Sequence, residues 1–212
     1  MASVVIHMAI AKEVNKTLKR NEKDILLGTI APDVAKNINM TKKISHFVTE
    51  PDEDNIPDLE LFLSRYQKFF NDDFVLGYYI HLYADYLWFK YFISEITDKV
   101  VITKLDGTQV KLFDNMLSLY IYNDYTNLNH QLIKKYKLDI DGFDNLDKVE
   151  NIIKEIPMDK LYVIVDKTKE IVANAESEKE FIFNIDHVEK FIHFAKQLIL
   201  SNLRDLNVIE YY

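Results

Sequence analysis

The sequence contains no cysteine. Disulfide bonds and thiolate metal ligands are therefore excluded, and any metal ion must be bound by histidine and carboxylate side chains. Glycine and proline are scarce as well, with 4 of each among 212 residues. Because these residues interrupt regular structure, their scarcity predicts long helices joined by modest loops. The glycine-rich phosphate-binding motifs, the G-x-S-x-G nucleophile motif and the H-E-x-x-H zinc motif are all absent.

Positive charge is also in short supply, with 26 Lys and Arg against 34 Asp and Glu. Proteins that bind nucleic acid stably depend largely on Lys and Arg, so such binding is not expected here. No apolar stretch reaches the ~18–20 residues of a membrane span, and no transmembrane segment is expected. The first residues lack the basic and apolar regions of a secretory signal, which favours a cytoplasmic location.

Helical periodicity dominates what is present and predicts an all-α protein, a single domain over residues 1–212. About seven to eight helices are expected around a long central helix at 74–92. The expected helices cover residues 3–19, 22–28, 59–70, 74–92, 115–136, 146–156, 158–175 and 186–206. One β-hairpin insertion is predicted over about 100–112, because β-branched residues flank Asp106-Gly107.

The central helix, FVLGYYIHLYADYLWFKYF, carries almost no polar residues apart from His81 and Asp85. Their spacing of four places both side chains on one face of the helix. Burying either one alone costs on the order of 2–7 kcal/mol or more, so something must compensate them. A divalent metal bound by both is one solution. A structural hydrogen bond in which Asp85 holds His81 is the other.

Three further polar residues precede this helix. His7 lies beside the apolar stripe of the first helix and is either a histidine at the edge of the core or a ligand. Asp33 follows Pro32, which favours an extended Ala31 and a bend, so Asp33 is either a helix cap or a functional carboxylate. His46 ends a lysine-containing loop.

In chain order, His7, "LLGTIAPD", "KKISHF" and "GYYIHLYADYLW" resemble the zinc-dependent phospholipase C family. That family combines a G-x-x-x-P-D turn, a lysine-rich loop ending in His, and a G-x-x-x-H-x-x-x-D helix. The resemblance covers about residues 3–95 and extends weakly to about residue 136. It implies that Asp33, His46, His81 and Asp85 bind one zinc ion, and that His7 with a bridging Asp85 binds a second.

Zinc ions of that family polarise a phosphodiester or phosphomonoester and supply the attacking water. The resemblance therefore implies a metal-dependent phosphoesterase whose substrate is a small phosphoester or a lipid headgroup. Asp33 is also a candidate catalytic base that orients the water. Two alternatives remain open: a related zinc nuclease, and a non-catalytic helical protein with a structural metal site or a degenerate site.

The family's third zinc needs two more histidines and a glutamate downstream of the central helix. The chain offers only Asp124, Asn127 and His130 there. Their spacing places them along one side of the predicted helix 115–136, where they are either additional ligands or a solvated face. One or two zinc ions, or another divalent metal, are therefore expected rather than three.

Overall fold

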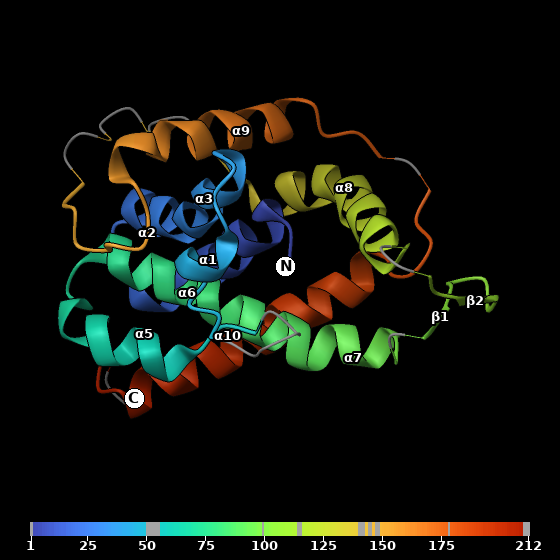
Figure 1. Cartoon of the computed structure of the whole chain (residues 1–212), viewed down its shortest axis with the longest axis horizontal. Helices are drawn as coiled ribbons and strands as arrows, with labels where there is room; N and C mark the ends of the chain where they lie inside the picture. Colours follow the sequence, from blue (N-terminus) through green and yellow to red (C-terminus); the bar gives the residue numbers. More distant parts are fainter. Residues whose placement is uncertain are drawn as a thin grey trace.

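A computed structural model describes residues 2–49, 56–98, 100–113, 116–139, 143, 146, 149–177 and 179–209. It confirms the predicted all-α architecture with one small antiparallel hairpin (Figure 1). The described elements are α1 (Val4–Leu18), α2 (Glu22–Ile30), α3 (Val34–Asn37), α4 (Lys42–Ser45), α5 (Leu59–Tyr66), α6 (Asp73–Leu87), α7 (Ile93–Ile96), β1 (Val101–Thr103), β2 (Gln109–Lys111), α8 (Met116–Tyr136), α9 (Leu161–Ala173) and α10 (Ile185–Asp205). Within these ranges, no helix is both long and apolar enough to cross a bilayer.

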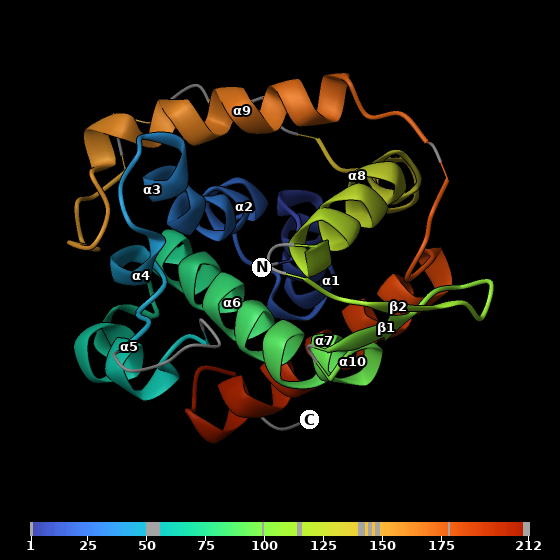
Figure 2. The ribbon, with the colours of Figure 1, turned by 45° about the vertical axis from the view of Figure 1, so that its right-hand side comes forward.

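Helix α6 is the buried centre of the fold and packs against α1, α2, α5 and α10 (Figures 1 and 2). It begins where the Asp72 side chain accepts a hydrogen bond from the Val75 backbone N–H at 2.9 Å. The α-helix ends at Leu87 and continues as a π-helix over Trp88–Phe92. The predicted helix 74–92 is thus confirmed as a continuous helical segment with two hydrogen-bonding patterns.

Helices α2 and α6 approach each other so closely that their backbones nearly touch. The Thr29 hydroxyl lies between the two helices and donates to the carbonyl of Ile25 at 2.7 Å and to that of Gly77 at 3.2 Å. Thr29 is completely buried there. This close packing fixes the end of α2 against the middle of α6, where His81 stands.

The expected bend at Pro32 is wrong. Ala31 has helical backbone angles, φ −58° and ψ −39°, and Ala31–Asp33 forms a 3-10 helix that joins α2 to α3. Proline is tolerated in a first helical turn, where its missing N–H needs no partner. The segment before His46, expected to be a loop, also contains a short helix, α4, capped by the Thr41 side chain.

The predicted helix at 146–156 is also wrong for the described residues of that segment, none of which lies in an α-helix. Tertiary contacts with α5 hold its backbone instead. The Lys154 backbone N–H donates to the Tyr66 hydroxyl at 3.2 Å. The Glu155 carboxylate accepts from the same hydroxyl and from Arg65, each at 2.6 Å. These partners outweigh the modest helix propensity of the segment.

The hairpin lies within the predicted range of 100–112. Its strands pair antiparallel, with Val101 opposite Lys111 and Thr103 opposite Gln109. Gly107 has φ +83° in the turn, a conformation that glycine adopts without steric cost. The Leu105 N–H donates to the Phe181 carbonyl at 2.7 Å and ties the turn to the segment before α10.

Candidate metal centre

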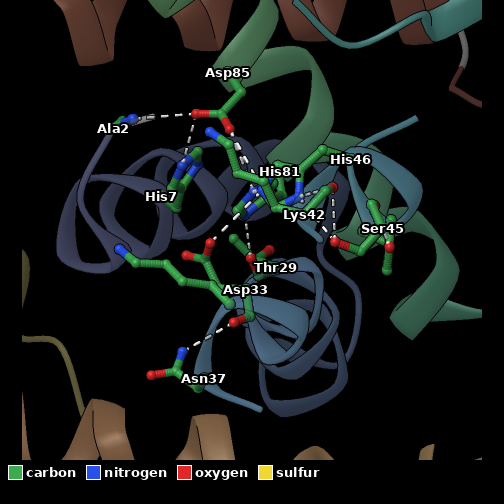
Figure 3. Close-up of polar contacts among 12 residues, drawn as sticks. Ala2, His7, Thr29, Asp33, Asn37, Lys42, Ser45, His46, His81 and Asp85 are labelled. Atoms are coloured by element: carbon green, nitrogen blue, oxygen red, sulfur yellow. Dashed lines mark hydrogen bonds and ion pairs between the residues drawn. The ribbon is translucent and has the colours of Figure 1, made fainter. Parts of the chain in front are cut away.

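Five side chains named from the sequence as candidate ligands meet in the interior of the molecule (Figure 3). They come from different elements: His7 from α1, Asp33 from the end of the 3-10 helix, His46 from the residue after α4, and His81 and Asp85 from α6. None is more than 6% exposed. Groups this deeply buried require partners, because unpaired polar atoms inside a protein are costly.

His81 is oriented by the end of α2. Its Nδ1 lies 2.7 Å from the Thr29 carbonyl oxygen. Since a carbonyl only accepts hydrogen bonds, Nδ1 carries the hydrogen and donates it. In neutral His81 the Nε2 atom therefore presents a lone pair to the cluster, which is the arrangement of a histidine ready to bind a metal ion.

His46 is oriented in the same way by its own helix. Its Nδ1 lies 3.1 Å from the Lys42 carbonyl oxygen, with the Ser45 hydroxyl at 3.0 Å. In neutral His46 the Nε2 atom therefore also carries a lone pair. It faces the Nε2 atom of His81 at 3.2 Å. Two lone pairs at this distance repel each other unless a cation lies between them.

Carboxylate oxygens complete this group. Asp85 Oδ2 lies 3.6 Å from His81 Nε2 and 3.7 Å from His46 Nε2. Asp33 Oδ1 lies 3.6 Å from His46 Nε2. Neither oxygen has a hydrogen-bond partner. Ligands at ~2.0–2.2 Å from a tetrahedral zinc stand about 3.3–3.6 Å apart, so the distances from each carboxylate oxygen to these nitrogens are close to those around a zinc-sized ion. Asp33, His46 and His81 lie close enough together to bind one ion.

A second group consists of His7, His81 and Asp85. His7 Nε2 lies 3.1 Å from Asp85 Oδ1, and neither nitrogen of His7 has a hydrogen-bond partner. The Ala2 backbone N–H donates to the same Asp85 oxygen at 3.1 Å. Because His81 Nε2 has a single lone pair, Asp85 is the residue that can serve both groups, with one oxygen in each.

The protonation states favour cation binding. Burial would raise the pKa of Asp33, but His46 and His81 lower it to about 2. Burial likewise opposes ionisation of Asp85, yet His7 and His81 hold its pKa well below its usual value. Burial lowers the pKa of His81 to about 3 and keeps the ring neutral. Among the described residues, no Lys or Arg forms an ion pair with either carboxylate. The interior therefore holds two ionised carboxylates and the neutral imidazole of His81, the protonation states that metal ligands need.

The three additional candidates do not join these groups. Asp124 is buried, but its carboxylate accepts hydrogen bonds from the backbone N–H groups of residues 181–183. The Asn127 side chain donates to the Lys179 carbonyl at 2.8 Å. His130 is exposed. Among the described residues, the potential metal-binding groups contain none of the three.

Sequence reasoning did not single out the residues that orient the ligands. Thr29 and Lys42 act through backbone carbonyls, which leave no signature in a sequence. Ser45 adds its hydroxyl beside the His46 ring. Its position directly before the histidine was the one signal that could have identified it. These contacts are the outer hydrogen bonds that fix tautomer and ring direction in metal sites.

The centre borders a cleft of about 370 Å³ that Asp33 helps to line, with residues of α3, α8, α9 and the N-terminal segment. Ala2, whose N–H contacts Asp85, lines it as well. Of the five clustered side chains, Asp33 is the one that lines this cleft. No protein-family model, curated protein or solved structure matches this chain.

Proposed function

We propose that the protein is a metal-dependent phosphoesterase, similar in its ligand set to the zinc-dependent phospholipase C family. The observation that carries this proposal is that His46 Nε2 and His81 Nε2 lie 3.2 Å apart, with Asp33 Oδ1 and Asp85 Oδ2 each 3.6–3.7 Å from one or both of these nitrogens. A bound divalent ion would supply a Lewis acid and would lower the pKa of a coordinated water to ~7.

Each side chain has a distinct role in this proposal. His46 and His81 bind the ion through nitrogens whose rings are already oriented. Asp85 would hold the same ion, and its other oxygen, 3.1 Å from His7 Nε2, would be available to a second one. Asp33 lines the cleft, so it is both a ligand and the carboxylate best placed to accept a proton from the attacking water. In the hydrolysis, water oxygen bonds to phosphorus, the ester P–O bond breaks, and the leaving oxygen is protonated.

A structural metal site is the second candidate, and the deep burial of the cluster favours it. His7 and His81 are 0% exposed and Asp85 is 1% exposed. Structural zinc sites have four protein ligands and no open position, whereas catalytic sites keep one position for water. The position of Asp33 on the cleft favours a catalytic site, because a substrate bound in the cleft would lie beside this ligand.

Elemental analysis of purified protein, paired with hydrolysis of p-nitrophenyl phosphate and bis-p-nitrophenyl phosphate before and after chelation, tests the proposal. We expect one or two equivalents of metal and an activity that chelation removes and zinc restores. Bound metal without hydrolysis of any phosphoester would support the structural site instead. Protein that folds normally and takes up no metal would exclude both.

A further inference from the structure

The cleft beside the metal centre contains a lysine that has no carboxylate partner among the described residues. Lys36 lies on α3, three residues after Asp33, and both line the cleft. Its ammonium donates to the Tyr122 hydroxyl at 3.0 Å and lies 4.9 Å from the centre of that ring. Figure 2 shows α9 lying alongside both α3 and α8, the helices that carry these two residues.

The other lysine of the cleft is differently placed. Lys167 on α9 forms an ion pair with Glu170 at 2.8 Å, and both residues line the cleft. Among the described residues, Lys36 forms no ion pair, and its known partners are the hydroxyl and ring of one tyrosine. Its charge is therefore available to an anionic ligand. A hydrogen bond from the Lys36 ammonium would increase the affinity for such a ligand, because hydrogen bonds to ionised groups are about twice as strong as neutral ones.

An anionic substrate needs such a group here. The chain has a net charge of −8, and two of its carboxylates, Asp33 and Asp85, are buried in the metal centre. A positive side chain at the cleft offsets this field at the point where the substrate enters. We propose that Lys36 binds a non-bridging oxygen of a phosphoryl group in this cleft, and that the substrate is a small, water-soluble phosphoester. This inference rests on the proposed function for the reaction, but the anion site is testable by itself.

The size and rim of the cleft limit the substrate. A volume of about 370 Å³ lies at the lower end of small-molecule sites, which span roughly 300–1,000 Å³. Its lining includes Asn37, Asn174 and the Lys167–Glu170 pair. Of the strongly exposed large hydrophobic residues, Tyr122 is the one that lines it. Other apolar residues of the lining, such as Ile164 and Ile171, are buried or half-buried. A cleft that takes its substrate from a bilayer would expose apolar side chains at its rim, so this one fits a ligand arriving from water.

Phenylphosphonate tests the anion site, because its P–C bond is not hydrolysed and binding can be measured by calorimetry on the zinc-loaded protein. Lys36→Met should weaken binding by about tenfold or more, since a hydrogen bond to a charged group contributes roughly 1.5–3 kcal/mol. Lys36→Arg, which keeps the charge, should bind within about threefold of the wild type. Lys190→Met is the matched control, because it removes one positive charge from α10, which does not line the cleft.

Each outcome separates this inference from the proposed function. Equal binding by wild type and Lys36→Met, or no binding by the zinc-loaded wild type, overturns the anion site while leaving hydrolysis elsewhere in the cleft open. Lys36-dependent binding to a protein that takes up no metal supports the anion site and removes the phosphoesterase. Phosphatidylcholine vesicles should not displace phenylphosphonate; displacement would overturn the assignment of a water-soluble substrate. Circular dichroism of each variant shows that the fold is retained.

Discussion

Gly28 of α2 and Gly77 of α6 face each other's helix so closely that neither position has room for a side chain. A Cβ at residue 28 would lie 2.0 Å from the Phe74 carbonyl oxygen, and one at residue 77 would lie 2.1 Å from the Ile25 carbonyl oxygen. This contact brings the Thr29 carbonyl within 2.7 Å of His81 Nδ1. The two glycines therefore set the distance on which the orientation of the central ligand depends.

Alanine at either glycine should destabilise the fold and disturb the metal centre together. Both atoms that would be struck belong to the backbone, so the helices must separate. Overpacking of this kind typically costs about 1–3 kcal/mol, occasionally more. Thermal denaturation and metal analysis of Gly28→Ala and Gly77→Ala should show a lower melting temperature and reduced metal content.

Gly107→Asn is the control for these substitutions. Nothing lies within 4 Å of the position of its Cβ, and asparagine tolerates the positive φ of this turn. It should leave metal content unchanged. Alanine variants as stable as the wild type would show that the helices can move apart without loss, and that the contact does not position His81.

The helical periodicity and the spacing of His81 and Asp85 were sufficient to predict α6 and its polar face, because an i, i+4 pair shares a face whatever surrounds it. The meeting of His7, Asp33 and His46 with that pair could not be derived from periodicity. It depends on how α1, α2 and α4 pack on α6, and the sequence supplied it only through a resemblance to a family.

Errors arose where tertiary contacts decided the local structure. The predicted helix at 146–156 gave way to hydrogen bonds with Tyr66 and Arg65, which lie about ninety residues earlier in the chain. Asp124 was a candidate ligand because it shares a helix with other polar residues. Its real partners, the N–H groups of residues 181–183, belong to a distant segment that no spacing rule could connect to it.

Substitution of a clustered ligand should reduce metal content, whereas substitution of an exposed histidine should not. His81→Ala and Asp85→Asn should each strongly reduce bound metal, because loss of one ligand leaves the site under-coordinated. His187→Ala and His193→Ala should retain it, since both histidines are exposed on α10. Metal analysis after extensive dialysis makes the comparison. Equal losses from all four variants would place the metal elsewhere.

Asp124 should behave as a structural residue. Its carboxylate accepts from the N–H groups of Phe181 at 2.9 Å and Phe183 at 3.0 Å, in a fully buried position. Asp124→Ala leaves these donors unsatisfied, at roughly 1–3 kcal/mol for each buried group. Chemical denaturation should show this loss of stability, while metal content per folded molecule stays at the wild-type level. Loss of metal with unchanged stability would make Asp124 a ligand after all.

The metal-free protein should lose stability in mild acid because of His81. Burial lowers the folded-state pKa of His81 from 6.5 to about 3, so the unfolded chain binds the proton first. The contribution of neutral His81 to the free energy of unfolding is therefore complete above pH 6.5. As the pH falls towards 3, this contribution declines by up to about 1.4 kcal/mol per pH unit. Chemical denaturation of chelated protein at pH 7.5 and pH 5 measures this slope. His81→Asn should flatten it, and an unchanged slope would assign the effect to other groups.

Asp33→Asn distinguishes a metal centre from a hydrogen-bonded polar core. At pH 8 the metal-free wild type holds the Asp33 carboxylate 3.6 Å from His46 Nε2, and Asp33 Oδ1 has no hydrogen-bond partner. An asparagine amide removes the buried charge and supplies the missing donor to His46. A new buried hydrogen bond contributes about 0.5–1.5 kcal/mol. The variant should therefore be more stable than the wild type when both are free of metal.

Zinc should reverse that order. The wild type gains stability from every ion that binds the folded state, whereas Asp33→Asn has lost an anionic ligand and gains less. With chelator the variant should therefore have the higher melting temperature, and with excess zinc the wild type should have it. If Asp33 were an ordinary member of a polar core, its replacement would lower the melting temperature under both conditions by a similar amount. A reversal of the order between the two conditions would mean that the buried carboxylate serves to bind a cation and lowers the stability of the metal-free protein.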